Sequence, residues 1–323
     1  MKKINTITVL LAVLLAGCHA RTSSQSMPPV TEVAPAQGAA QQSTFQTPEQ
    51  AADFLIAAAK SQNRTALRQI LGPELDQLFS GDPVQDTNAL QHFSQAAAEQ
   101  HRLEQISPTS ERLVIGTKNW PYPIPLVKRA DGNWFFDTHA GVAEILARRI
   151  GRDELETIAT CRAYVVAQRE YASQDRNHDD VLEYAQHFIS DPGRHNGLYW
   201  PVAPNEEQSP LGPLVARAAA EGYRPDPQSK QLTPYHGYYY RILTRQGSNV
   251  PGGAYDYIIN GHMIAGFALV ASPAKYGSSG IMTFVVNHRG RVYQKDLGPK
   301  TDSIARAMTT YNPDRTWTFV KDQ

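Results

Sequence analysis

Apolar residues follow a helical spacing near the start of this 323-residue chain and a strand-like alternation near its end. Thr47-Pro48-Glu49-Gln50 supplies a capping residue, a proline at the first helical position and an early acidic charge, which together predict a helix start. Further helices are predicted at residues 64–71 and near 90–101, and a strand at 112–116. Two short apolar runs at 124–128 and 134–137 flank Asp131-Gly132, the pattern of a hairpin.

The second half is predicted to combine one long helix with a meander of strands. Residues 142–150 have helical spacing, Gly151 is expected to interrupt it, and Asp153 is expected to cap a second helix that ends near residue 173. Residues 175–234 are rich in Pro and Gly, with a short helix at 214–221. The period then changes to two, which predicts five antiparallel strands, at residues 238–244, 255–260, 267–272, 281–287 and 291–295.

The N-terminus has the features of a secretion signal. Lys2 and Lys3 precede an apolar run at residues 4–15 that is too short to span a bilayer, and the run closes with Leu15-Ala16-Gly17-Cys18. This ending resembles the bacterial lipobox, which implies cleavage before Cys18 and attachment of acyl chains to it. The alternative is an ordinary signal peptide with an incidental cysteine. His19 stands where an Asp would resemble an inner-membrane retention signal, so the expected location is the outer membrane, facing the periplasm.

Composition bounds the domain organisation and the partners. The 31 Lys and Arg residues balance the 31 Asp and Glu residues, so no basic surface for nucleic acid is expected. If Cys18 carries lipid, the other cysteine, Cys161, has no disulfide partner. Beyond the leader and a polar tether, roughly 280 residues suggest two domains. The predicted organisation is a signal peptide at 1–17, a lipidated cysteine and flexible tether at 18–44, an N-terminal α+β domain at 45–141 and a C-terminal α+β domain at 142–323.

Several short motifs from residue 45 onward, weak singly and specific together, resemble one family. These motifs resemble domain of unknown function family 2950, and they are Trp120-Pro-Tyr-Pro-Ile-Pro-Leu-Val127, Arg148-Arg-Ile-Gly151, Gly197-Leu-Tyr-Trp200, Ser209-Pro-Leu-Gly-Pro213, Pro251-Gly-Gly253 and Tyr276-Gly-Ser-Ser-Gly280. The resemblance groups the chain with bacterial envelope lipoproteins but implies no mechanism.

Two fold resemblances follow from the order of elements. Helices followed by a hairpin sheet resemble the small cystatin-like and nuclear-transport-factor-like α+β domains. The C-terminal helix, variable loop and meander resemble the globular head of type IV pilins and secretion pseudopilins, although the membrane-spanning half of a pilin helix is missing. A generic α+β layer packing remains the alternative.

One segment carries the spacing of a metal-binding loop. Asp175, Asn177 and Asp179 place oxygen ligands at positions one, three and five, and Glu183 stands at position nine, as in calcium loops. Asp180 occupies the sixth place, where such loops have glycine, so an Asp in the left-handed conformation is required. A weak calcium site is therefore predicted. A polar turn that caps the preceding helix is the alternative.

No catalytic constellation stands out in the sequence. Gly277-Ser278-Ser279-Gly280 precedes a strand rather than a helix, so it is interpreted as a tight turn and not as a nucleophile elbow. The sequence therefore favours a non-catalytic binding or scaffolding component of the envelope, held at the membrane through Cys18 and partnered by an envelope protein. Two alternatives stay open: an envelope hydrolase whose site assembles from distant residues, and small-ligand binding in the N-terminal domain.

Overall fold

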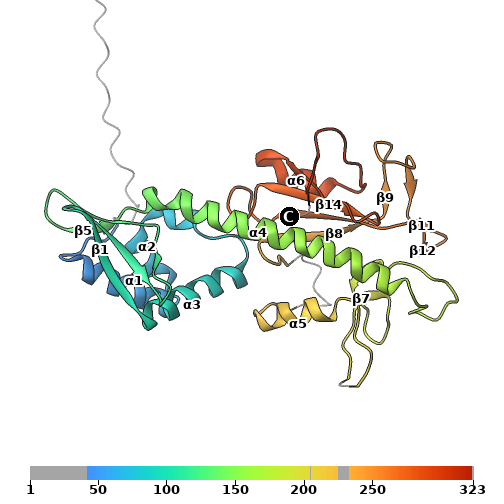
Figure 1. Cartoon of the computed structure of the whole chain (residues 1–323), viewed down its shortest axis with the longest axis horizontal. Helices are drawn as coiled ribbons and strands as arrows, with labels where there is room; N and C mark the ends of the chain where they lie inside the picture. Colours follow the sequence, from blue (N-terminus) through green and yellow to red (C-terminus); the bar gives the residue numbers. More distant parts are fainter. Residues whose placement is uncertain (1–41, 204, 225–232, 322–323) are drawn as a thin grey trace, which may run out of the picture. The chain divides into compact units, whose positions relative to one another are not determined.

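The computed structural model describes residues 42–203, 205–224 and 233–321, which fall within one compact unit, Ala40–Gln323 (Figure 1). The predicted signal peptide, Cys18 and most of the predicted tether lie outside the described residues. The fold is mixed α+β, with antiparallel sheets and one long helix packed on a sheet. Among the described residues, none of the helices combines the length and apolarity that a bilayer crossing requires.

The first helices begin where local capping signals place them. Helix α1 (Pro48–Lys60) starts after Thr47, whose side chain accepts a hydrogen bond from the Gln50 N–H. Helix α2 (Arg64–Leu71) is capped in the same way by Asn63, and a 3₁₀ turn η1 (Pro73–Gln77) follows. Helix α3 (Pro83–Glu99) starts seven residues earlier than expected, because Asp82 caps it through the N–H groups of Val84 and Gln85.

A five-stranded sheet follows these helices. It comprises β1 (His101–Ser107), β2 (Ser110–Ile115), β3 (Trp120–Pro121), β4 (Leu126–Lys128) and β5 (Trp134–Phe136), in the order β1-β2-β4-β5 with β3 paired to β2. The predicted hairpin is confirmed as the antiparallel pair of β4 and β5. Strand β1 was not predicted, since its residues were assigned to the end of the preceding helix or to no element.

Helix α4 (Thr138–Tyr171) is continuous for 34 residues, so the predicted interruption at Gly151 is wrong. Glycine in a helix costs only about 1 kcal/mol relative to alanine, and packing along the helix outweighs that cost. Gly141 lies so close to Ile124 that a Cβ would come within 2.6 Å of its side chain. Further along, Cys161, Tyr164 and Val165 are buried in a different core. The helix therefore joins two hydrophobic cores (Figure 1).

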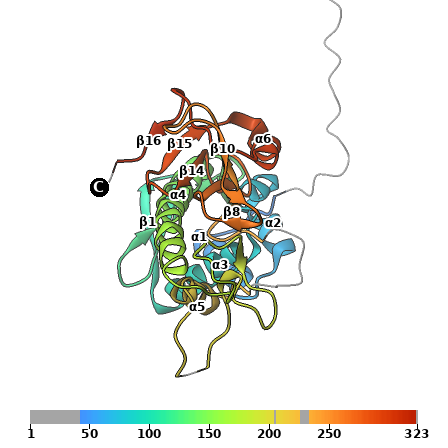
Figure 2. The ribbon, with the colours of Figure 1, turned by 90° about the vertical axis from the view of Figure 1, so that its right-hand side faces the viewer.

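The C-terminal sheet confirms most of the predicted meander. Its order is β16 (Thr318–Phe319), β15 (Tyr293–Asp296), β14 (Met282–Asn287), β13 (Ala268–Pro273) and β8 (Tyr238–Leu243), all antiparallel. The predicted strand at 255–260 is instead divided. Strand β10 (Tyr255–Asp256) pairs with β9 (Arg245–Gln246), and β11 (Ile258–Ile259) pairs with β12 (His262–Met263). Helix α4 packs against β14 and β13 (Figure 2).

The predicted irregular region holds three further elements. Strands β6 (His187–Ile189) and β7 (Gly197–Tyr199) pair in parallel, and α5 (Gly212–Ala220) lies close to the predicted short helix. Arg217 of α5 forms an ion pair with Glu156 of α4 at 2.7 Å. After β15 a second 3₁₀ turn, η2 (Gly298–Lys300), leads into helix α6 (Thr301–Ala307), which lies beside β13.

Candidate functional site

An apolar cavity of about 440 Å³ lies in the N-terminal half, among helices α1, α2 and α3, the sheet and the first turns of α4. Its walls are predominantly aliphatic and aromatic, and include Leu55, Leu67, Leu71, Leu75, Leu78, Leu90, Phe93, Ile115, Tyr122 and Ile145. Leu55, Leu67 and Leu71 are each at most 3% exposed, so the cavity continues the hydrophobic core rather than lying on the surface. Burial raises the pKa of the Tyr122 phenol, which keeps this wall neutral.

Cations and aromatic rings surround the mouth of the cavity. Trp120 is 40% exposed, and the Arg148 guanidinium lies 5.4 Å from its ring centroid while pairing with Glu144 at 2.5 Å. The Arg152 side chain, also in the lining, is 57% exposed. The mouth therefore presents two partly exposed guanidinium groups beside an apolar interior, one paired with Glu144 and the other with Asp153.

The third arginine of the lining, Arg149, forms hydrogen bonds within the protein. Arg149 donates to the Ser278 carbonyl and hydroxyl at 2.9 Å each and to the carbonyl of Leu78. It is 8% exposed, and burial lowers the pKa of its guanidinium. Ser278 donates in turn to the Phe79 carbonyl at 2.9 Å, so the Gly277–Gly280 segment is a structural turn. The sequence interpretation of this motif as a turn is confirmed by the hydrogen bond from the Gly277 N–H to the Gly280 carbonyl.

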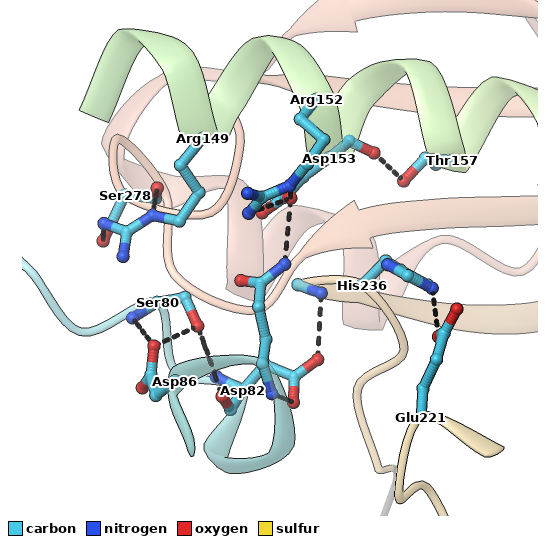
Figure 3. A network of polar contacts seen from close by, with 12 residues as sticks. Ser80, Asp82, Asp86, Arg149, Arg152, Asp153, Thr157, Glu221, His236 and Ser278 are labelled. Atoms are coloured by element: carbon cyan, nitrogen blue, oxygen red, sulfur yellow. Dashed lines mark hydrogen bonds and ion pairs between the residues drawn. The ribbon is translucent and has the colours of Figure 1, made fainter. Parts of the chain in front are cut away.

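A buried polar network adjoins the cavity and connects α3, α4 and the start of β8 (Figure 3). Gln85 donates to the Asp153 carboxylate at 2.9 Å, and Asp82 accepts from the Gly237 N–H at 3.0 Å. His236 Nε2 lies 2.8 Å from a carboxylate oxygen of Glu221. This network joins residues that are far apart in sequence and stiffens the boundary between the two cores.

Asp153 is the electrostatically unusual member of this network. It was expected to cap a helix, but its side chain is fully buried within α4. One oxygen accepts hydrogen bonds from Gln85 and Arg152, whereas the other, Oδ2, has no hydrogen-bond partner among the described residues. Burial raises the pKa of this carboxyl to about 6, against the opposing effect of Arg152.

The loop predicted to bind calcium separates into two parts. Asp175 uses both carboxylate oxygens for the loop backbone, accepting from the N–H groups of His178, Asp179 and Asp180 at 2.7, 3.3 and 2.9 Å. Desolvation by itself would raise the pKa of Asp175, but the three backbone hydrogen bonds together outweigh it and lower the pKa. Asp180 adopts the expected left-handed conformation, with φ of 66°. Asp175 therefore shapes the loop, and the calcium itself stays a prediction.

The other part of the loop converges on a histidine that sequence spacing did not reveal. Nδ1 of His262, in β12, lies 3.5 Å from Oδ2 of Asp179 and 3.4 Å from Oε2 of Glu183. Among the described residues these three side chains form a group whose ligand atoms all lie within 4.8 Å of one another. We call this group the carboxylate–imidazole cluster. Hydrogen bonds of the Met263 backbone to Glu183 and Tyr184 hold His262 beside the loop, and a contact between segments so far apart in the chain leaves no local signal.

The same cluster opens onto a second, polar cavity. This cavity measures about 260 Å³, and besides the cluster its lining includes Tyr171, Asn177, His187, Arg194 and Asn196. Asn177, which was among the predicted ligands, donates to Asp179 and Glu183 at 2.7 Å each. Its amide therefore orients both carboxylates.

Comparison with protein families matches residues 42–320 to the family described as Protein of unknown function (DUF2950). The chain belongs to this family. No curated protein matches the chain, and no solved structure matches it either. Membership covers both cavities but names no activity for either, so the functional argument rests on their geometry.

Proposed function

We propose that this DUF2950 member is a non-catalytic binding component of the bacterial envelope, held at the outer membrane by acyl chains on Cys18 and working with an envelope protein partner. The observation that carries the binding activity is the apolar cavity of the N-terminal half. Its volume of about 440 Å³ falls within the range of roughly 300–1,000 Å³ that is typical of small-molecule sites.

The chemistry of the cavity defines the ligand class. An aliphatic chain would replace water along the leucine-rich wall, and each buried methylene contributes about 0.8 kcal/mol to binding. The side chains of Arg148 and Arg152 are 43% and 57% exposed, so an anionic head group would share them with their partners Glu144 and Asp153. Arg149 is buried and already donates to carbonyl oxygens. The proposed ligand is therefore an amphipathic anion of the fatty-acid type.

We also propose finer relationships for the fold. The N-terminal half, with helices opposite a curved antiparallel sheet around a cavity, is compatible with a cystatin-like or nuclear-transport-factor-like domain. The C-terminal half, with α4 packed on the meander, is compatible with a pilin-like head. A division near residue 141 is supported by the two separate hydrophobic cores.

The test of binding is a matched pair of variants on α3. Ala89 lines the cavity and Ala98 does not, and both are exposed alanines of the same helix. Ala89→Phe should fill the mouth and weaken the binding of dodecanoate to the full-length protein at least tenfold, measured by equilibrium dialysis. Ala98→Phe should bind as the wild type does. Absence of dodecanoate binding to the wild type, or equal binding by both variants, would overturn the proposal.

The same assay tests the head-group assignment. Replacing Arg148 and Arg152 by Gln should weaken dodecanoate binding but leave the binding of neutral dodecanol unchanged, because the positive charge at the mouth is removed. Arg152→Gln also removes the contact with the buried Asp153, so circular dichroism must first show that the variant folds. Equal losses for both ligands would show that the arginines act through packing and not through charge.

A hydrolase is the second candidate function, and one observation favours it. The carboxylate–imidazole cluster brings two acids and a histidine to the wall of an open polar cavity, as general acid–base chemistry requires. Loss of a hydrolytic activity on envelope material in both Glu183→Gln and His262→Gln, with dodecanoate binding intact, would support this candidate over the binding function.

A further inference from the structure

We propose that the carboxylate–imidazole cluster of Asp179, Glu183 and His262 is a binding site for a divalent transition-metal ion of the zinc type. The site lies in the C-terminal half and is independent of the apolar cavity and of the binding function proposed for it. Two carboxylates come from the loop after α4, and the imidazole comes from β12, about 80 residues later in the chain. Three side chains from two separate segments thus bring one ligand atom each to within 4.8 Å of one another.

The two separations from His262 match the edges of a metal coordination shell, and the third ligand pair, Asp179 and Glu183, lies within 4.8 Å. A tetrahedral ion with ligands at about 2.0–2.1 Å holds its ligand atoms about 3.4 Å apart. His262 Nδ1 lies 3.4 Å from Glu183 Oε2 and 3.5 Å from Asp179 Oδ2. A charge-assisted hydrogen bond from a histidinium to a carboxylate would be shorter, at about 2.7–2.9 Å. The spacing therefore fits ligands around an ion better than a direct ion pair.

The surrounding hydrogen bonds hold the ligands in place before any ion binds. Asn177 donates to Asp179 and Glu183 at 2.7 Å, the Val181 N–H donates to the second oxygen of Asp179 at 3.0 Å, and the Met263 N–H donates to Glu183 at 3.1 Å. These bonds fix the carboxylates next to each other although both are negative. Outer contacts of this kind orient metal ligands and raise affinity 10- to 100-fold.

The ligand types favour a zinc-like ion over the calcium expected from loop spacing. Calcium takes six to eight oxygen ligands, and this cluster offers two carboxylates and a nitrogen. Imidazole suits zinc, copper, iron and nickel. Asp175, the first ligand of the expected calcium loop, is occupied by three backbone N–H groups. Three protein ligands beside an open cavity leave a coordination position for water or another small molecule.

The test is metal binding by the full-length protein after treatment with a chelator. Zinc should raise the melting temperature, and cobalt should give the visible absorption bands of a four-coordinate site. Calcium at the same concentration should do neither. His262→Gln should abolish the cobalt bands, while His187→Gln, which changes a histidine of the same cavity outside the cluster, should keep them. Asn177→Ala should weaken zinc affinity 10- to 100-fold.

Asp179→Asn provides a second ligand variant if His262→Gln does not fold, with circular dichroism as the check of folding. It too should lose the cobalt bands. The proposal is overturned if folded wild-type protein shows neither zinc stabilisation nor cobalt bands, or if the bands persist in a folded ligand variant. A calcium effect that survives His262→Gln would instead indicate the oxygen-only loop site.

Discussion

At the scale of single residues, Asp153 links electrostatics most directly to stability. Its carboxyl faces Arg149 and Arg152 of its own helix and Gln85 of α3, yet burial dominates and raises its pKa to about 6 from 3.8. In the unfolded chain the carboxyl ionises at the ordinary value, so the folded state holds the proton more tightly. Ionisation of Asp153 therefore lowers the free energy of unfolding. This loss is absent below about pH 4, grows as the pH rises from about 4 to 6, and is complete above pH 6.

Asp153→Asn should remove this cost. A pKa difference of about two corresponds to about 3 kcal/mol at most, so the variant should be more stable than the wild type at pH 7.5. The two should converge near pH 4, where both side chains are neutral. Urea unfolding at several pH values measures this, with the exposed Asp53→Asn as control. A variant that is less stable at pH 7.5 would show that the Arg152 contact outweighs desolvation.

Residue types and spacing predicted part of the candidate metal site but not its geometry. Asp179, Glu183 and Asn177 were found because a calcium-like spacing is visible in the sequence, and the left-handed Asp180 followed from that pattern. His262 was missed because it reaches the loop through contacts of Met263 with Glu183 and Tyr184, about 80 residues earlier in the chain. The apolar cavity could be predicted only in part: small-ligand binding in the N-terminal domain was an open alternative, but the lining residues come together only through packing of the helices and the sheet.

At the scale of elements, local signals predicted boundaries well wherever one residue decides them. Thr47 and Asp131-Gly132 fixed a helix start and a hairpin because capping and turn chemistry act over three or four residues. The helix break predicted at Gly151 was wrong because glycine in a helix is only mildly unfavourable. Packing of the helix before and after Gly151 stabilises α4 as one continuous helix. The strand predicted at 255–260 is divided because Tyr255–Asp256 pairs with the preceding strand and Ile258–Ile259 pairs with the following one. An alternating pattern does not reveal such a change of partner.

The two glycines of α4 should respond oppositely to alanine. A Cβ at Gly151 meets nothing within 4 Å, so Gly151→Ala should stabilise the protein by about 0.4–1 kcal/mol through reduced freedom of the unfolded chain. A Cβ at Gly141 would come within 2.6 Å of Ile124, so Gly141→Ala should destabilise it by about 1–3 kcal/mol. Chemical unfolding of both variants measures the pair. Destabilisation by Gly151→Ala would indicate a helix interruption in solution.

At the scale of the whole molecule, α4 and the polar network connect the N-terminal and C-terminal halves, so each half uses contacts supplied by the other. A C-terminal fragment that begins at Gly151, where the sequence predicts a helix break, would lack the first part of α4. The continuous helix and the bonds of Arg149 to Ser278 indicate that such a cut would remove contacts that the C-terminal half uses. Domain limits are harder to predict than elements, because a shared helix leaves no compositional boundary.

The proposed membrane attachment depends on the thiol of Cys18. Cys18→Ser should leave an uncleaved or soluble protein, because the thioether requires the cysteine thiol. Fractionation of envelopes measures the outcome. A variant that stays in the outer-membrane fraction as fully as the wild type would contradict attachment through Cys18.

The proposed binding function is tested most directly by locating the alkyl chain of a bound fatty acid in the protein. Bromine quenches indole fluorescence at short range, and Trp120 is the tryptophan that lines the mouth of the cavity. A dodecanoate brominated on its chain should quench the fluorescence of the wild type, and Trp120→Phe should lose most of that quenching while keeping its affinity for the acid. Quenching that is unchanged in Trp120→Phe, or absent in the wild type at saturating ligand, would contradict binding in this cavity.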